Sequence, residues 1–193
     1  MKLFGYVLDK TGSAVPGAIV ELKNDAFQTV LSARSDDRGY YEIEAEAQCY
    51  PFLTAVKSYA QAYLEYWCQN VDLTKDLALD ARIDTLEVYG LHAFSVKGGR
   101  NALMVYFRPM SLDRFRAGEQ DIAPLIRRIR AKLDGKQAEV LLSNPVRESI
   151  DNGELTAYLI QIANPNPDRH WKRVDIEIWD HNGSYGAATF FQK

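Results

Sequence analysis

The placement of glycine and proline in the first forty residues constrains the fold of this chain more than any other feature. Gly12, Pro16-Gly17 and Gly39 separate short runs in which apolar and polar residues alternate. Alternation with period two predicts half-buried strands, and the Gly, Pro and Asp residues between the runs predict tight turns. The pattern therefore predicts a small antiparallel sandwich, and it points to no reaction.

The rest of the first half continues the pattern. Predicted strands cover Leu3–Leu8, Ala18–Leu22, Phe27–Ala33, Tyr40–Ala45 and Phe52–Val56, and the Glu residues between Tyr41 and Ala45 should form a solvated face. The stretch Tyr59–Val71 fits a helix or a strand. We favour a turn and then a strand, because aromatic residues prefer strands and no helix cap is evident. The alternating run Asp76–Ile83 is expected to close this domain.

The second half also predicts strands, about seven in number, which is typical of an immunoglobulin-like sandwich. They are Leu86–Val96, Ala102–Arg108, Arg127–Leu133, Lys136–Leu142, Leu155–Ala163, Arg173–Trp179 and Tyr185–Phe191. Hairpin signals stand at Gly98-Gly99, Asp134-Gly135 and Asp180–Gly183. In the connection Pro109–Ile126, the spacing of Ile122, Leu125, Ile126 and, just beyond it, Ile129 predicts a short turn or helix at one end of the sandwich. We therefore expect an all-β chain of two consecutive β-sandwiches, residues 1–83 and 84–193.

Composition narrows the class of protein. Of 193 residues, 47% are hydrophobic and 25% charged, as in a folded globular protein. The net charge of −3 argues against a general nucleic-acid binder. Lys and Arg number 8 against 13 Asp and Glu in residues 1–84, and 15 against 13 in the rest. No apolar run is long enough to span a bilayer, and no signal-peptide core follows Met1, so we expect a cytoplasmic protein.

The two cysteines, Cys49 and Cys68, are too few for a disulfide scaffold and lack the spacing of a zinc site. They could meet across neighbouring strands in an oxidising compartment. We expect two buried thiols.

The first half resembles a known family. The pattern is formed by Gly5, Val7, Asp9, Gly12, Pro16, Gly17, Ala18 and Val20. It resembles the carboxypeptidase regulatory-like domain, over residues 1–83. The resemblance implies a transthyretin-like (prealbumin-like) seven-stranded sandwich, with glycines at positive φ and an aromatic residue of Asp37–Tyr41 in the core. It also implies a non-catalytic appendage, because none of the matched positions is catalytic. The second half resembles no family that we can name.

Candidate catalytic residues do not form a recognisable set. His92, His170 and His181 lack the close spacing of zinc peptidases or of iron dioxygenases on similar sandwiches. The chain ends Phe190-Phe191-Gln192-Lys193, without the Tyr-Arg-Gly-Ser ending of transthyretin-like hydrolases. We predict no catalytic residue, cofactor or metal, and interpret His181 as a solvated turn residue.

Two further patterns have a plain and a functional interpretation. Asp180, Asn182 and Ser184 alternate oxygen ligands like half of a calcium loop, but position twelve of such a loop is Phe191, so we favour a plain turn. An arginine cluster could bind an anion, although the alternation of Arg128, Arg130 and Lys132 is typical of a solvated strand face. The cluster comprises Arg108, Arg114, Arg116, Arg127, Arg128 and Arg130.

Aromatic residues suggest the remaining candidate. Trp171 follows the polar stretch Asn164–His170, where a ring at a sandwich edge could stack on a sugar. Packing at the start of the next strand is the simpler interpretation, and the same two interpretations hold for Trp67 and Tyr63.

Three functions stay open on the sequence alone. The first is a non-catalytic interaction or accessory module with an unknown protein partner. The second is a small-ligand or glycan-binding module using loop aromatics. The third is a hydrolase in which His170 or His181 would meet a carboxylate and a nucleophile. Edge strands could also pair two copies into a homo-oligomer.

Overall fold

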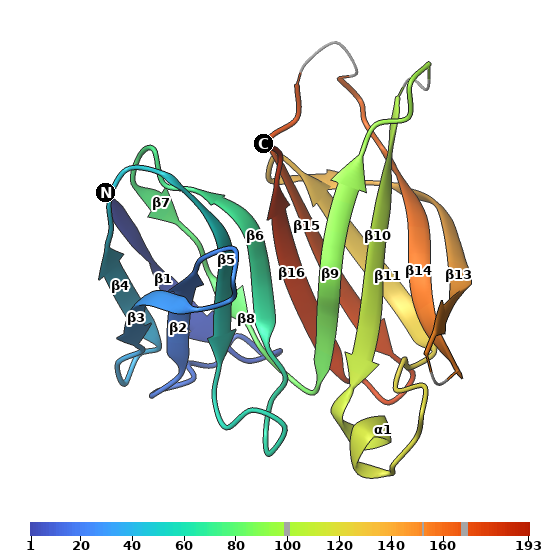
Figure 1. Cartoon of the computed structure of the whole chain (residues 1–193), viewed down its shortest axis with the longest axis horizontal. Helices are drawn as coiled ribbons and strands as arrows, with labels where there is room; N and C mark the ends of the chain where they lie inside the picture. The colour runs from blue at the N-terminus through green and yellow to red at the C-terminus, as the bar shows by residue number, and fades with distance from the viewer. Residues whose placement is uncertain (99–100, 152, 167–169) are drawn as a thin grey trace.

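The computed structural model describes residues 1–98, 101–151, 153–166 and 170–193. Sixteen strands and one short helix form within these ranges, and the strands make three sheets (Figure 1). The chain is an all-β protein with two consecutive sandwiches, as predicted. No helix in the described ranges is long and apolar enough to cross a membrane.

The first sandwich contains strands β1 to β8. Their bounds are β1 Lys2–Leu8, β2 Ile19–Lys23, β3 Thr29–Arg34, β4 Tyr40–Glu44, β5 Cys49–Val56, β6 Tyr66–Asp72, β7 Leu77–Ala78 and β8 Ala81–Arg82. One layer is β4-β1-β7, with β8 also on β1, and the other is β3-β2-β5-β6. The residues between Tyr59 and Val71 form a turn and then β6, as predicted.

The second sandwich contains eight strands and helix α1 (Leu112–Arg116). The strands are β9 Leu86–Phe94, β10 Ala102–Ser111, β11 Ile126–Leu133, β12 Lys136–Ala138, β13 Val140–Ile150, β14 Gly153–Ala163, β15 Arg173–Asp180 and β16 Tyr185–Phe191. One layer is β13-β14-β10-β9 and the other is β12-β11-β15-β16.

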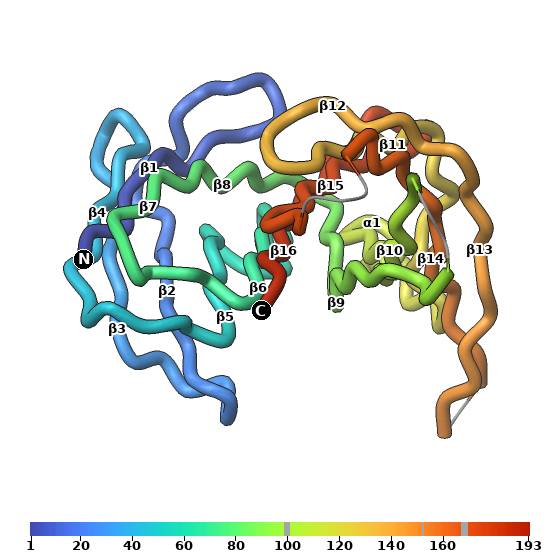
Figure 2. Tube along the Cα trace, turned by 90° about the horizontal axis from the view of Figure 1, so that it is seen from above, coloured from blue at the N-terminus to red at the C-terminus, as the bar shows by residue number. Residues whose placement is uncertain are grey.

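A single eight-stranded sheet runs through both sandwiches. Its order is β12-β11-β15-β16-β6-β5-β2-β3, and β16 joins β6 in parallel, with Ala188 opposite Trp67 and Thr189 opposite Cys68. In Figure 2 this sheet is the lower layer of the first sandwich and the upper layer of the second. The two cores therefore lie on opposite faces of one sheet, and backbone hydrogen bonds continue past the boundary expected near Ile83.

Strand β16 is buried along its whole length because it faces both cores. Tyr185, Ala187 and Phe191 pack in the first core, whereas Ala188 and Phe190 pack in the second. Gly186 has no room for a side chain, since a Cβ atom there would lie 2.8 Å from the backbone of Leu86 on β9. The C-terminal strand thus binds the two halves together.

The turn residues of the opening motif have the backbone roles predicted for them, with one exception. Gly12, Gly17 and Gly39 have positive φ, where a side chain would be strained. Gly5 does not. A Cβ atom on Gly5 would lie 2.1 Å from the carbonyl oxygen of Leu79, so this glycine permits a close approach of two backbones. Tyr41 fills the core, as the resemblance implied, and its hydroxyl donates to that same Leu79 carbonyl at 2.6 Å.

The prediction of one strand over Asp76–Ile83 is wrong. Two short strands, β7 and β8, pair in parallel with β1 on either side of Leu79 and Asp80. The regular ladder stops there because the Leu79 carbonyl accepts the Tyr41 hydroxyl and the Asp80 carboxylate accepts the Tyr6 amide at 2.9 Å.

Two predictions in the second half need correction. The segment Lys136–Leu142 is not one strand, since β12 pairs with β11 and the chain then crosses to the other layer, where β13 pairs with β14. The short helix lies before the predicted position, at α1, where the Ser111 hydroxyl accepts the Arg114 amide. Ile126 and Ile129 belong to β11 instead. Of the predicted hairpin glycines Gly98-Gly99, Gly99 lies outside the described residues.

Candidate functional site

The histidines do not come together into a site. His92 on β9 lies against Phe94 and Phe190, with ring centroids 5.9 Å and 5.2 Å away, while His170 and His181 are exposed on loops. None of the three forms a hydrogen bond within the described part of the chain, and no group of His, Cys, Asp or Glu residues described there is arranged to hold a metal ion.

The loop Asp180–Ser184 is a plain turn, as favoured from the sequence. The Asp180 carboxylate is buried and accepts the backbone amides of Asn182 at 2.9 Å and Ser184 at 2.8 Å. Its oxygens stabilise the turn between β15 and β16, so they are engaged by the chain itself.

Trp171 is not a loop aromatic that faces solvent. Its side chain is 5% exposed and packs in the second core near Phe190, with ring centroids 6.2 Å apart. Residues 167–169 of the polar stretch before it lie outside the described residues. Trp67 is also buried, and Tyr63 is half-buried, so the packing interpretation holds for both.

The arginine cluster is divided among separate ion pairs. Arg108 pairs with Glu148, Arg114 with Glu119, Arg116 with Asp113, and Arg130 with Glu177. Arg128 and Arg130 both lie over the ring of Trp179, with guanidinium carbons 4.9 Å and 5.2 Å from its centroid. The cluster as a whole therefore forms no single anion site.

The expectation of two buried thiols is half wrong. Both cysteines are free, but Cys49 is exposed and only Cys68 is buried. Burial raises the pKa of the Cys68 thiol well above its usual value. The two residues are not opposite one another, because Cys49 pairs with Asp72 and Cys68 with Leu53.

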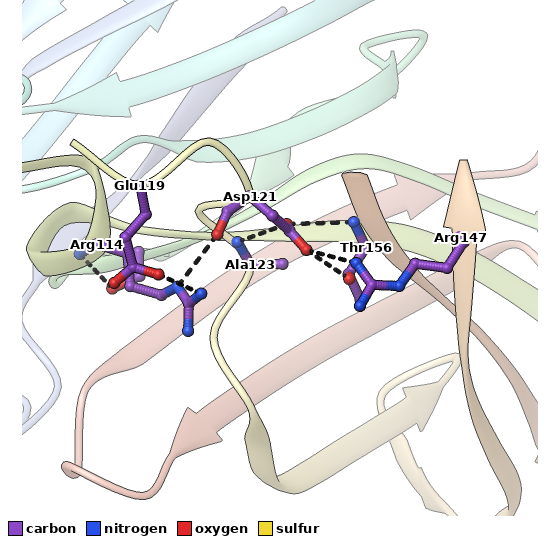
Figure 3. Close-up of polar contacts among 7 residues, drawn as sticks. Arg114, Glu119, Asp121, Ala123, Arg147 and Thr156 are labelled. Carbon is purple, nitrogen blue, oxygen red and sulfur yellow. Dashed lines mark hydrogen bonds and ion pairs between the residues drawn. The ribbon is translucent and has the colours of Figure 1, made fainter. Parts of the chain in front are cut away.

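Asp121 is the centre of a polar cluster in the second sandwich (Figure 3). Its carboxylate accepts the Thr156 hydroxyl at 2.7 Å and the Ala123 amide at 3.2 Å, and it pairs with Arg147 at 3.1 Å. Partial burial raises the pKa of Asp121, but these partners together lower it below its usual range. The cluster holds the loop after α1 against β14, which is a structural role.

A different cluster, at the junction of the two sandwiches, consists of aromatic rings. We call Phe27, Phe52, Trp67 and Tyr89 the aromatic patch. Phe27 stacks on Phe52 with centroids 4.4 Å apart and planes at 16°, Phe52 meets Trp67 at 86°, and Trp67 meets Tyr89 at 88°. Phe52, Trp67 and Tyr89 lie on β5, β6 and β9, which border the lower side of the junction in Figure 2, and Phe27 lies in the turn between β2 and β3. The patch thus joins residues from both sandwiches.

Phe27 is the exposed end of the aromatic patch. Half of its side chain is exposed, and its φ of 59° is unusual for a residue with a bulky side chain. The Asn24 side chain holds this turn by accepting the amides of Ala26 and Gln28, both at 3.0 Å. The chain therefore fixes an aromatic ring at the surface in a conformation that costs energy.

Two carboxyl groups border the aromatic patch, and neither forms an ion pair within the described residues, although the charge of Lys23 acts on Glu65. Glu87 is 1% exposed and accepts Trp67 Nε1 at 2.8 Å and the Glu65 amide at 3.2 Å. Burial, assisted by the charge of Glu65, raises the pKa of Glu87 to about 7. Burial also raises the pKa of Glu65, whose side chain has no hydrogen bond or ion pair within the described residues. Burial and both carboxylates raise the pKa of Tyr59 nearby to about 12.

A buried hydroxyl lies on the same face. Thr54 alternates with the core residues Leu53 and Ala55 on β5, opposite Glu21 on β2 and Trp67 on β6. It is 1% exposed, and its hydroxyl has no partner among the described residues. Within the described residues, the face therefore combines aromatic rings, carboxyl groups that form no ion pair and a hydroxyl without a partner, which suits binding better than bond breaking.

The sequence interpretation missed the aromatic patch. Phe27 and Phe52 were assigned only to predicted strands. From the alternation of its strand, Glu87 would be expected on the outward face. One signal for the site was available in the sequence, the acidic residue between the apolar residues Leu86 and Val88. It could not show that Glu87 is buried, because that burial depends on the tertiary contact of β6 with β9.

Comparison with known proteins adds little. No family model and no curated protein matches the chain. A solved structure of a DUF3823 family protein from Bacteroides ovatus is similar over 100% of this chain and 99% of that one, at 10% identity and a TM-score of 0.33. BcpA, the major pilin subunit of Bacillus cereus, is similar over 98% of this chain and 67% of that one, at 11% identity and a TM-score of 0.32. At these TM-scores neither neighbour supports a conclusion on function.

Proposed function

We propose that this chain is a non-catalytic interaction protein. Its aromatic patch would receive a segment of a partner protein that carries a lysine or arginine beside apolar side chains. The observation that carries the proposal is Phe27, a half-exposed ring held at positive φ and stacked on Phe52. An aromatic ring fixed at the surface is the type of residue that anchors protein interfaces.

The carboxyl groups beside the aromatic patch favour a partner with a positive charge. Glu65 is half-buried and forms no ion pair among the described residues, since the charge of nearby Lys23 offsets only part of the effect of burial on its pKa, and Glu87 has only hydrogen-bond donors. A Lys or Arg side chain would neutralise these carboxylates and could also lie over an aromatic ring. Residues 1–84 carry 8 basic against 13 acidic residues, so the surrounding surface attracts the same sign of charge.

The same proposal includes a family assignment for the first half. We propose that residues 1–83 form a carboxypeptidase regulatory-like domain in the cytoplasm. The positive φ of Gly12, Gly17 and Gly39 and the buried Tyr41 support the assignment, since these are the backbone and core roles of the motif.

A selection experiment tests the proposed function. A phage-displayed library of random peptides is selected on the immobilised full chain, and binding of the enriched peptides is measured by NMR titration of ¹⁵N-labelled protein. We expect enriched peptides to contain Lys or Arg next to apolar residues, and amides of β5, β6 and β9 to shift. Phe27→Ala should weaken binding at least about tenfold, the loss expected for an interface anchor.

Phe115→Ala is the matched control, because Phe115 is 55% exposed on α1, outside the aromatic patch. It should leave peptide binding unchanged. The proposal fails if no peptide family is enriched, or if the enriched peptides bind the Phe27→Ala variant as tightly as the parent chain. Peptides that bind without any basic residue would refute the cationic partner, and binding of neutral glycans at the patch instead would show a different ligand class.

A further inference from the structure

A groove of about 330 Å³ lies on the other side of the junction, away from the aromatic patch. The first sandwich contributes Asp80 and Arg82 at β8, and the second contributes Lys132 from β11 and Arg173 and Asp175 from β15. We call this the junction groove. Its volume is at the small end of the range of ligand sites in proteins.

The carboxylates that line the junction groove already have partners. Asp175 accepts the Thr189 hydroxyl at 2.6 Å and pairs with Arg173 at 2.7 Å. The Thr189 hydroxyl in turn accepts the buried Tyr66 hydroxyl at 2.7 Å. This chain of hydrogen bonds is fixed within the protein, so Asp175 is not free to bind a cation.

The other two carboxylates of the junction groove are engaged as well. Glu177 accepts the Tyr185 hydroxyl at 2.8 Å and pairs with Arg130 at 3.1 Å. Asp80 accepts the Tyr6 amide at 2.9 Å. The acidic groups of the junction groove therefore serve the fold.

Two cations of the junction groove have no such partner. Neither the Lys132 ammonium nor the Arg82 guanidinium forms an ion pair or hydrogen bond with any residue that the structure describes. They come from different sandwiches, and both side chains are only partly exposed. Arg130 and Arg173 are paired with Glu177 and Asp175, so among the described residues the two unpaired cations face one carboxylate without a cation, that of Asp80, and the groove keeps an excess of one positive charge. An excess of positive charge in a small groove attracts an oxyanion.

We propose that the junction groove binds a small molecule through an oxyanion group, a phosphate or a carboxylate, held between Arg82 and Lys132. An Arg guanidinium offers a planar pair of hydrogen-bond donors, and a Lys ammonium offers a compact positive charge. A phosphate or a carboxylate can bind to both side chains. Such a ligand would contact both sandwiches. The inference does not depend on the proposed partner of the aromatic patch, because the two sites share no residue.

Titration at low ionic strength tests the inference. Inorganic phosphate and succinate are added separately to ¹⁵N-labelled full-length protein, and amide shifts are followed by NMR. We expect saturable, millimolar binding of at least one of them, with shifts at Arg82, Lys132 and Arg173. Lys132→Gln and Arg82→Gln should each weaken binding about tenfold, and added salt should weaken it as well.

Two further variants make the result specific. Arg128→Gln removes a cation from the same strand face, over Trp179, and should leave the affinity unchanged. Lys132→Arg keeps the charge and should retain binding. Thermal unfolding of every variant shows whether it is folded. Absence of saturable shifts with both anions overturns the inference, as does equal affinity in the Lys132→Gln/Arg82→Gln double variant.

Discussion

The two sides of the junction differ in the partners of their buried acidic side chains. In the junction groove Asp175 and Glu177 each meet a guanidinium and a hydroxyl within 3.1 Å, and Asp80 accepts a backbone amide. Beside the aromatic patch, Glu87 is almost fully buried with an indole and an amide as its only donors. Among the described residues, the groove has hydrogen-bonded carboxylates and two cations without an ion pair, whereas the patch has aromatic rings and carboxyl groups without an ion pair. The difference separates charged groups that stabilise the fold from charged groups that a second molecule would pair with.

The largest expected effect comes from neutralising Glu87. Its pKa in the folded chain is about 7, above the ordinary value of 4.5 that applies when the chain is unfolded. Between these pH values the folded state holds a proton that the unfolded state has lost, so stability falls as pH rises from 4.5 to about 7. A raised pKa of this size corresponds to roughly 3 kcal/mol.

Glu87→Gln should therefore be more stable than the parent chain at about pH 8, by up to roughly 3 kcal/mol, and equally stable near pH 4.5. Urea unfolding across this pH range measures the difference. Glu154→Gln is a suitable control, because Glu154 is exposed at the start of β14. A difference that does not change with pH would show that Glu87 is ionised in both states or has a salt-bridge partner.

The next effect tests the strand that separates the two sides. Gly186→Ala places a Cβ atom 2.8 Å from the Leu86 backbone, at the contact between β16 and β9. Since backbone cannot move aside as a side chain can, we expect a loss of about 2 kcal/mol in the free energy of unfolding. Gly186 is not at positive φ, so the loss reports crowding alone.

Gly90→Ala supplies the comparison for Gly186. Gly90 is at φ 63° with open space around it, so its substitution should cost only the roughly 1 kcal/mol of a left-handed residue. Chemical unfolding of both variants ranks them. If Gly186→Ala were as stable as the parent chain, β16 and β9 would not be in the close contact that joins the halves.

Local turn chemistry explains why most of the fold could be predicted. Asp9 accepts the amides of Thr11 and Ser13, and Asp36 accepts those of Arg38 and Tyr40, within segments of five residues. Such contacts depend on adjacent residues and leave a pattern in the sequence. The apolar run at the end of the chain likewise predicted β16, although not that both of its faces are buried.

The junction could not be predicted in the same way. β16 pairs with β6 across more than a hundred residues, and a parallel pairing needs no turn that would mark it. Lys132 was interpreted correctly as part of an alternating strand face, but its position beside Arg82 depends on that pairing. Phe27 lies near Trp67 because β2, β5 and β6 are neighbours in the sheet, and Glu87 meets Trp67 where β9 packs on β6. Both candidate sites therefore arise from contacts without a local pattern.

The smallest expected effect tests the chain of hydrogen bonds beside the junction groove. Tyr66→Phe removes the hydroxyl that donates to Thr189, which still donates to Asp175. The loss of one buried hydrogen bond should cost about 1 kcal/mol, measured by urea unfolding. Tyr41→Phe loses a hydroxyl that donates to the Leu79 carbonyl in the first core and should cost a similar amount. Only Tyr66→Phe should also shift the amides of Asp175 and Arg173 in NMR spectra, because only Tyr66 contributes to the chain that orients them. Equal spectra at those amides would mean that the Tyr66 hydroxyl does not help to orient Asp175, and the contrast between the two sides of the junction would then depend on Arg173 and the Thr189 hydroxyl alone.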